Sequence, residues 1–263
     1  MEVTPKRMAD LFSLHGRKVL ITGGGQGLGL TMAKGLAAAG ASIAIVDIDG
    51  DRARQAASTI ASGQTRAVGI TGDVTSPDEA ERAVDEAIRA LGGLDILLNN
   101  AGIAILAPAE EVSFEDFKKT YEVDVFGLFT MSQKAFPALR DSGHGVIVNM
   151  ASMAGISVLT PQEHTAYHSA KAAVIMITKS LAVEWAEFGI RVNAIAPGYM
   201  LTPPVEKLRD EDPGRWSEWM SRVPLRRVGV PDDLVGAVVY LTSDASSYMT
   251  GATLVVDGGY TCL

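Results

Sequence analysis

A tyrosine and a lysine stand four residues apart within a run that is compatible with a long helix. Tyr167 and Lys171 would lie on one face of that helix, close enough for the lysine ammonium to favour the ionised form of the tyrosine. A phenol held in this way can exchange a proton with an alcohol or a carbonyl oxygen. Because many helices carry this spacing by chance, the pair needs support from its surroundings.

A serine and a glycine-rich turn supply that support. Ser152 follows the apolar run 145–148 and precedes Tyr167 by 15 residues. The turn at residues 23–29 lies directly between another apolar run and a helical segment. A hydroxyl, a tyrosine and a lysine beside a dinucleotide site are the groups that reversible hydride transfer to a carbonyl requires.

These residues must be positioned by a regular alternation of strands and helices. Buried strands of the parallel type are predicted at residues 18–22, 42–46, 66–70, 94–98, 145–149, 190–195 and 253–256. Helices are predicted from the glycine turn to about residue 40 and at residues 51–61, 76–91, 113–139, 165–188 and 231–242. The pattern predicts a single-domain, doubly wound (Rossmann) α/β fold with about seven parallel strands and helices on both faces. Ligands would bind at the carboxyl ends of the strands.

The same pattern predicts the boundaries of the functional parts. Residues 1–16 are interpreted as a leader with a short helical turn at most, and residues 17–263 as one dinucleotide-binding catalytic domain. Residues 199–228 are rich in proline, charge and tryptophan and interrupt the alternation, so we expect them to form a substrate lid. Trp216 and Trp219 would cover the nicotinamide end or serve only as packing residues.

Composition narrows the class of protein. With 263 residues, 47% of them hydrophobic, the chain can form one sizeable core. A net charge of -8 and a pI near 5.0 argue against nucleic acid or an anionic membrane as a partner. The single cysteine, Cys262, and the absence of an apolar signal or spanning segment favour a cytoplasmic protein without disulfides. No histidine, cysteine and aspartate cluster has the spacing of metal ligands, so we expect no metal.

The glycine turn and the end of the second strand predict the cofactor. A bare backbone at residues 23–29 can approach a pyrophosphate at a helix N-terminus, although a merely tight turn is the alternative. Asp47 ends the second strand, where a carboxylate can bind both ribose hydroxyls and repel a 2′-phosphate. Because residues 23–29 contain no arginine or lysine, the sequence predicts NAD over NADP. Asp47 could instead be a surface turn residue beside Asp49 and Asp51.

Two further strand ends carry polar residues. Asp73 could meet the adenine amino group or simply form a turn. In Asn99-Asn100-Ala101-Gly102, we expect at least one amide to satisfy backbone groups between neighbouring strands, while backbone lines the cofactor groove.

Taken in order, these motifs resemble the short-chain dehydrogenase/reductase family from Val19 to Gly259. The motifs are Thr22-Gly-x-x-x-Gly-x-Gly29, Asp73-Val74, Asn99-Asn-Ala-Gly102, Ser152, Tyr167-x-x-x-Lys171, Pro197-Gly198 with Thr202, and Asp257-Gly-Gly259. The resemblance implies that Tyr167 is the general acid/base, that Ser152 holds the substrate oxygen, and that Lys171 binds the nicotinamide ribose and favours ionised Tyr167. It implies these cofactor contacts: Gly23, Gln26, Gly27, Leu28, Gly29, Asp47, Ile48, Asp73, Val74, Asn100, Ala101, Gly102, Tyr167, Lys171, Pro197, Gly198, Met200 and Thr202.

One position departs from the family pattern. The family usually has an asparagine three residues before a glycine in the long fourth helix, where it steadies a water that links the lysine to solvent; here Asp124 precedes Gly127. Its charge near Lys171 would offset part of the lysine's effect on Tyr167, which predicts a more alkaline activity optimum than in an Asp124→Asn variant. The alternative is a helix acid that pairs with a nearby base.

The loop before Tyr167 points to a branch of the family. It is about two residues longer than in many members, and with Pro161-Gln162 it resembles the branch of arabinitol, galactitol and threitol dehydrogenases and of sorbose and carbonyl reductases. Predicted substrate contacts are Ser152, Ala154, Gln162 and Tyr199. Gln162, Glu163 and His164 could bind several hydroxyls, or this polar loop could face water. His144 and His168 are expected to be solvated or structural.

The sequence therefore predicts an NAD-dependent oxidoreductase for a secondary alcohol or ketone, most simply a sugar alcohol. The alternatives are a reductase of 3-oxoacyl thioesters or other carbonyls, and a non-catalytic NAD-binding sensor. The family resemblance further implies that helices 113–140 and 165–188 pair between subunits, usually in a homotetramer.

Overall fold

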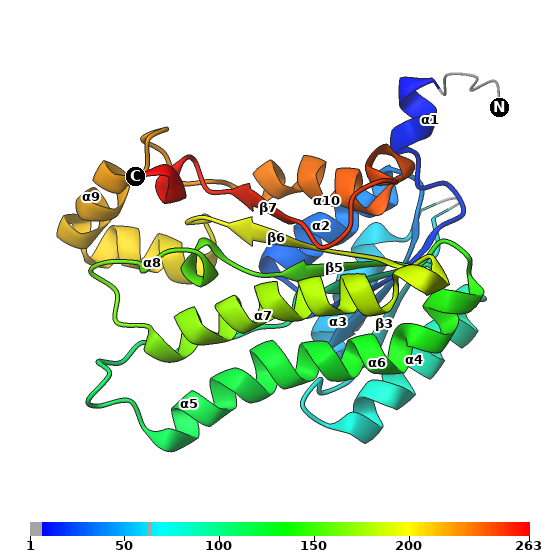
Figure 1. The fold of residues 1–263 in the computed structure, drawn as a ribbon, viewed down its shortest axis with the longest axis horizontal. Helices are drawn as coiled ribbons and strands as arrows, with labels where there is room; N and C mark the ends of the chain where they lie inside the picture. The colour runs from blue at the N-terminus through cyan, green and yellow to red at the C-terminus, as the bar shows by residue number, and fades with distance from the viewer. Residues whose placement is uncertain (1–6, 63–64) are drawn as a thin grey trace.

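One seven-stranded parallel sheet runs through the molecule. The computed structural model describes residues 7–62 and 65–263. In the order β3-β2-β1-β4-β5-β6-β7, all neighbours pair in parallel (Figure 1). The strands are β1 (Lys18–Thr22), β2 (Ser42–Asp47), β3 (Ala67–Thr71), β4 (Ile96–Asn99), β5 (Val146–Met150), β6 (Arg191–Pro197) and β7 (Thr253–Val256). The predicted fold class is confirmed, and the strand bounds differ from the predicted ones by only one or two residues.

Helices cover both faces of the sheet because successive strand residues point to opposite sides. In β1, Val19 and Ile21 pack under α2 (Gly27–Ala38), α3 (Gly50–Ile60) and α10 (Val235–Thr242). Leu20, between them, packs against α4 (Pro77–Leu91) and α6 (Leu128–Asp141), on the face that α7 (Thr165–Glu184) also covers (Figure 1). Burial on both faces explains why the strands read as continuous apolar runs.

The predicted capping box of α4 is only half formed. Ser76 caps the helix by accepting from the Glu79 N–H. The Glu79 carboxylate accepts a 3.0 Å hydrogen bond from the Asp73 N–H instead of from its own cap residue. Glu79 thus ties the start of α4 to the loop that follows β3.

The predicted helix over residues 113–139 is confirmed as one helical run without a break, but it is not α-helical throughout. The chain forms α5 (Phe114–Tyr121), then a π-helical segment (Glu122–Gly127), then α6. A π turn holds an additional residue and is frequent at functional sites. Asp124 lies within this wide turn.

The N-terminal part and the proposed lid both contain short helices. Helix α1 (Met8–Phe12) precedes Leu14, which is fully buried in the core and whose N–H donates to the Ala39 carbonyl. The end of the predicted leader is therefore part of the domain; residues 1–6 lie outside the described residues. Helices α8 (Pro203–Glu211) and α9 (Pro213–Arg222) lie at the end of the molecule toward which the arrowheads of β5 and β6 point (Figure 1). Among residues 7–62 and 65–263, none of the helices has the length and apolar composition needed to cross a bilayer.

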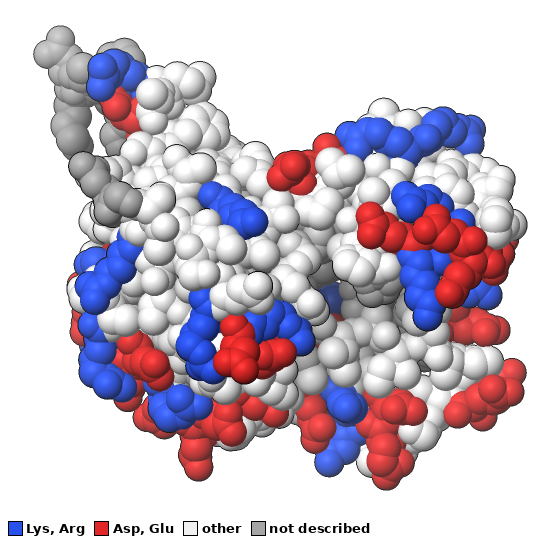
Figure 2. All heavy atoms as spheres, turned by 180° about the vertical axis from the view of Figure 1, so that it is seen from behind, with Lys and Arg blue, Asp and Glu red and all other residues white. Residues whose placement is uncertain are grey.

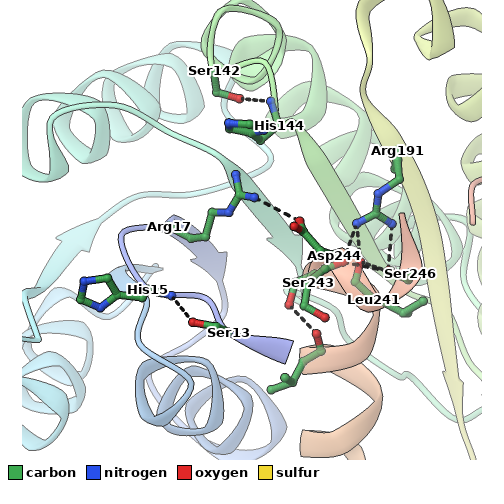
Figure 3. Close-up of polar contacts among 12 residues, drawn as sticks. Ser13, His15, Arg17, Ser142, His144, Arg191, Leu241, Ser243, Asp244 and Ser246 are labelled. Carbon is green, nitrogen blue, oxygen red and sulfur yellow. Dashed lines mark hydrogen bonds and ion pairs between the residues drawn. The ribbon is translucent and has the colours of Figure 1, made fainter. Parts of the chain in front are cut away.

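The amino ends of the strands carry a dense polar network (Figure 3). The Arg191 guanidinium donates to the carbonyls of Leu241, Ser243 and Met249 and to the Ser246 hydroxyl, at 3.0–3.3 Å. Arg17 Nη2 lies 3.3 Å from Asp244 Oδ1. A cavity of about 1030 Å³ opens beside this network, lined in part by His15, Arg17 and His144. Arginine here satisfies carbonyls that the end of α10 leaves free.

Candidate active site

A cavity of about 690 Å³ lies at the carboxyl ends of β1, β2 and β4. Figure 2 shows a hollow on the face opposite to that of Figure 1, with charged side chains of both signs near its rim. Predicted cofactor residues that line the cavity are Gly23, Gln26, Gly27, Leu28, Gly29, Asp47, Ile48, Asp73, Val74, Asn100, Ala101, Gly102 and Thr202. The topology thus brings four separate motifs to one wall.

The glycine turn is held by the amide that follows β4. Asn100 Nδ2 donates to the carbonyls of Thr22 and Gly23 at 3.1 and 2.9 Å. A Cβ on Gly29 would lie 2.5 Å from both this nitrogen and the Gly23 oxygen, so the turn can close only with glycine there. The expectation that one of the two amides joins neighbouring strand ends is confirmed by Asn100.

The first amide, Asn99, has a structural role inside the sheet. Its nitrogen donates to Ser132 Oγ and to Asn149 Oδ1, each at 2.9 Å. Asn149 in turn donates to the Thr178 hydroxyl at 2.9 Å. This buried chain fixes β4 and β5 against α6 and α7.

Asp47 and Arg52 share one end of the cavity. Asp47 is 6% exposed, and its Oδ2 accepts from the Gly25 N–H at 3.1 Å. Arg52 Nη1 lies 3.9 Å from Asp47 Oδ1, and Arg52 Nη2 lies 3.0 Å from Asp49 Oδ2. Sequence reasoning did not identify Arg52, because it searched for bases only in the glycine turn. The available signal was a basic residue in the first turn of the helix that follows Asp47.

The remaining predicted cofactor residues do not all reach this cavity. Asp73 lines it, yet its carboxylate also accepts from the N–H and hydroxyl of Thr75 at 2.9 and 2.8 Å, so it forms a turn as well. Pro197 ends β6 and Gly198 follows it, and neither lines the cavity; the Met200 side chain is buried in the core. The cavity wall adds residues that were not predicted to contact the cofactor: Val46, Arg52, Gly72, Ile103, Lys119, Val123 and Pro203.

The tyrosine and lysine lie together on α7 as predicted from their spacing. Lys171 is 4% exposed, and its Nζ lies 5.5 Å from the centroid of the Tyr167 ring. The same ammonium donates to the Met150 carbonyl at 2.9 Å. Burial opposes the charge on Lys171, but the nearby Asp124 and Tyr167 raise its pKa. The ammonium therefore stays charged beside the phenol.

Ser152 begins a short turn (Met153–Gly155) that packs on α7. Its Oγ accepts from the Ala154 N–H at 3.1 Å. A Cβ on Gly155 would lie 2.6 Å from the carbonyl of Lys171, so the turn rests directly on the α7 backbone. The serine is thereby anchored beside the helix that carries Tyr167 and Lys171.

Asp124 forms a buried ion pair with Lys171. It is 1% exposed; its Oδ2 lies 3.0 Å from Lys171 Nζ, and its Oδ1 accepts from the Ile103 N–H at 2.7 Å. Burial raises the pKa of Asp124, and Lys171 and the Ile103 N–H offset part of this effect. The direct contact corresponds to the alternative interpretation, an acid paired with a nearby base, rather than to a link through water.

The loop before α7 is exposed at Thr160, Pro161 and Glu163, and it buries Leu159 and Gln162. Gln162 is 8% exposed, and its amide lies 2.7 Å from the Tyr199 hydroxyl. His168 is structural, as predicted: its Nε2 accepts from the Leu159 N–H at 3.0 Å. His164 Nδ1 is buried without a partner among the described residues, and burial lowers the pKa of this imidazole to about 4, with a further contribution from His168. His144 is exposed.

Comparison with protein-family models gives one match, which covers residues 23–261. Its description is enoyl-(acyl carrier protein) reductase. Among individual relatives, galactitol 2-dehydrogenase (L-tagatose-forming) of Cereibacter sphaeroides is 39% identical over 95% of this chain and 97% of that protein. D-threitol dehydrogenase of Mycolicibacterium smegmatis is 38% identical over 95% of each chain.

Solved structures give the same picture. A short-chain type dehydrogenase/reductase from Mycobacterium marinum is 41% identical, with a TM-score of 0.91 over 97% of this chain and 99% of that one. A gluconate 5-dehydrogenase from Burkholderia cenocepacia, crystallised with NADP and tartrate, is 37% identical, with a TM-score of 0.90 over 98% of this chain and 100% of that one. The two solved structures thus share the fold, and this chain spans at least 95% of the length of each of the four proteins.

Proposed function

The chain belongs to the short-chain dehydrogenase/reductase family, and we propose that it oxidises a secondary hydroxyl of a sugar alcohol with NAD as cofactor. The observation that carries the chemistry is the buried Lys171 ammonium beneath Tyr167, with the Ser152 turn resting on the same helix. The similarity to galactitol and threitol dehydrogenases supports a substrate with several hydroxyls.

The residues at the carboxyl end of the sheet fit a dinucleotide. The glycine turn and the start of α2 would hold the pyrophosphate, because Gly29 leaves the backbone bare at a helix N-terminus. Asp47 would bind the adenosine ribose, and Lys171 the nicotinamide ribose. When bound, NAD supplies the carbon that accepts the hydride.

Asp47 supports NAD over NADP. Its buried carboxylate, fixed by the Gly25 N–H, would bind the ribose hydroxyls and repel a 2′-phosphate. Arg52 is the group that could favour NADP, but Asp49 already binds its guanidinium. Because the gluconate 5-dehydrogenase was crystallised with NADP, the preference needs a direct test.

The proposed proton transfer uses three side chains. Ser152 would hold the substrate oxygen by a hydrogen bond, and ionised Tyr167 would take the hydroxyl proton as the ketone forms. The Lys171 ammonium favours the ionised tyrosine, and Asp124 holds that ammonium in place. In the reverse direction Tyr167 would return the proton to the alkoxide oxygen.

The proposed substrate side consists of Ala154, Tyr199 and the lid helices. Ala154 is buried in a cluster against which Tyr167 and Tyr199 pack. We further propose a homotetramer that forms partly through the outer face of α6 and α7. Exposed apolar side chains there include Phe129, Met176 and Val183.

A second candidate is a reductase of 3-oxoacyl thioesters, because the description of the matching family model names a reductase of another carrier-bound acyl thioester, the enoyl form. A carrier-bound substrate calls for a basic docking surface, and the charge of -8 does not favour one. We therefore place this function second.

The proposal is tested by following NADH formation across a panel of four- to six-carbon polyols and simple 2-alkanols, with NAD and NADP in parallel. Turnover of one polyol with NAD is the expected result. Silence on every polyol, together with reduction of an acyl thioester, would favour the second candidate. Binding of NAD without any turnover would indicate a non-catalytic sensor.

A further inference from the structure

Three distant segments meet at one buried amide beside the proposed catalytic residues. Gln162 comes from the loop before α7, Tyr199 follows β6, and Trp219 lies in α9. In the amide orientation that satisfies both of its ends, the Gln162 oxygen accepts from the Tyr199 hydroxyl and from Trp219 Nε1, each at 2.7 Å. Its nitrogen then donates to the Thr160 carbonyl at 3.3 Å and to the Tyr199 hydroxyl at 3.2 Å. These bonds use the oxygen fully and both hydrogens of the nitrogen.

The two rings that the amide joins are stacked. Their centroids lie 4.2 Å apart with an interplanar angle of 6°, and Tyr260 packs edge-on against Tyr199 at 5.7 Å. Trp219 is 7% exposed and is the buried residue of α9, so its indole is the main anchor of that helix. Burial raises the pKa of Tyr199, which keeps its hydroxyl protonated. Arg222, one turn later, donates to the Thr160 hydroxyl.

The joined rings lie next to the reacting groups. Tyr199 and Tyr167 pack against the same apolar cluster, which includes Met153, Ala154 and Val223. Met153 and Ala154 directly follow Ser152. A movement of α9 would therefore displace the wall that faces Ser152 and Tyr167.

We infer that Gln162 is a positioning residue that fastens α9 over the substrate side by binding Tyr199 and Trp219, and that it is not a ligand of the substrate. The inference rests on the proposed function, in that the space beneath α9 is taken to hold the alcohol. It reassigns the predicted role of Gln162, because an amide occupied by the protein has no group left for a substrate hydroxyl. The fastening would set affinity for the alcohol and leave the affinity for NAD unchanged.

The test compares Gln162→Leu with Trp219→Phe, which removes the indole donor while keeping a ring for stacking. Each variant should raise the KM for the alcohol about tenfold, with a smaller change in kcat and none in the KM for NAD. The double variant should be no worse than the more severe single one, because both changes break the same contact. Ser221→Ala, an exposed position on α9, serves as the matched control.

Limited trypsin digestion gives a readout that needs no substrate. Lys207, Arg209 and Arg215 are exposed cleavage sites on the lid helices. Both variants should be cut there several-fold faster than the parent and the control. If the variants are cut faster but the parent turns over no polyol, the inference about Gln162 is supported and the proposed function is overturned. Turnover with unchanged KM and unchanged cutting, or additive effects of the two substitutions, would overturn the fastening.

Discussion

Each end of the sheet holds a cation, half-buried Arg191 at one and buried Lys171 at the other, and the two cations serve different purposes. At the amino end, Arg191 distributes its donors over three backbone carbonyls and a serine hydroxyl (Figure 3). At the carboxyl end, Lys171 binds one carbonyl and one carboxylate and lies beneath a tyrosine ring. The arginine completes the end of a helix, whereas the lysine adjusts the charge on a reactive group. Burial of a charge alone therefore does not identify a catalytic site; its partners do.

The largest effect is expected at the carboxyl end of the sheet, from Tyr167→Phe. Removing the phenolic oxygen should lower kcat about a thousandfold, because a general acid/base contributes 10²–10⁴. NAD should still bind, because the other predicted cofactor contacts remain, and the thermal unfolding temperature should be unchanged. Steady-state kinetics, cofactor titration and thermal unfolding of the same preparation check this. Residual activity near the parent value would remove Tyr167 from the proposed chemistry.

Arg191→Met should lower stability and leave activity nearly unchanged, which is the opposite of the effect of Tyr167→Phe. Several buried carbonyls lose their donor, so stability should fall by about 3 kcal/mol, which is roughly 6–10 °C in unfolding temperature for a chain of this size. Activity per folded molecule should remain close to that of the parent. Arg54→Met, which removes an exposed ion pair, should change stability little. A catalytic defect without loss of stability would contradict the distinction between the two ends.

Asp47→Ser tests whether the carboxylate at the carboxyl end of the sheet sets the preference for NAD over NADP. Loss of the carboxylate should lower kcat/KM for NAD on the order of a hundredfold and raise it for NADP, since Arg52 can then face a 2′-phosphate. Steady-state kinetics with NAD and with NADP measure this change in cofactor preference. In the double variant with Arg52→Ala, the gain with NADP should disappear. A parent enzyme that already prefers NADP would refute the assignment of Asp47.

Asp124→Asn should produce the smallest effect, a shift of the pH–activity profile. Asp124 raises the pKa of Lys171, so asparagine should lower it, and the lysine charge should favour ionised Tyr167 more strongly. Both changes move the profile for alcohol oxidation to lower pH, by about one unit. Because the pKa of Lys171 is raised in the fold, its contribution to stability is present below 10.5 and is lost as the pH rises through the raised value. In the variant this contribution should be smaller and should be lost over a narrower pH range, because the pKa of Lys171 in the fold is less raised. An unchanged pH–activity profile would argue against the coupling.

The fold could be predicted closely from the sequence, the site only in part. Strands buried on both faces are apolar throughout, so their positions could be predicted from short runs of apolar residues along the chain. The roles of Gln162 and Arg52 depend on the positions that a loop and the first turn of a helix give to their side chains. These positions result from the tertiary structure and could not be predicted from the local sequence. Met200 was assigned to the cofactor by motif, yet its side chain packs into the core. Direct contact of Asp124 with Lys171 likewise required the path of the helix between residues 122 and 127.

The π-helical segment at residues 122–127 is equivalent to one residue inserted into a continuous α-helix. The insertion offsets the angular phase of everything that follows it by about 100°. Helix α6 can therefore direct Leu128, Met131 and Leu139 inward in a phase that α5, whose buried residue is Thr120, does not set. A deletion within residues 122–127 would restore an unbroken α-helix at the cost of rotating one half against the other. The number of residues in this segment, and not only their identity, is thus a constraint on how the protein can change.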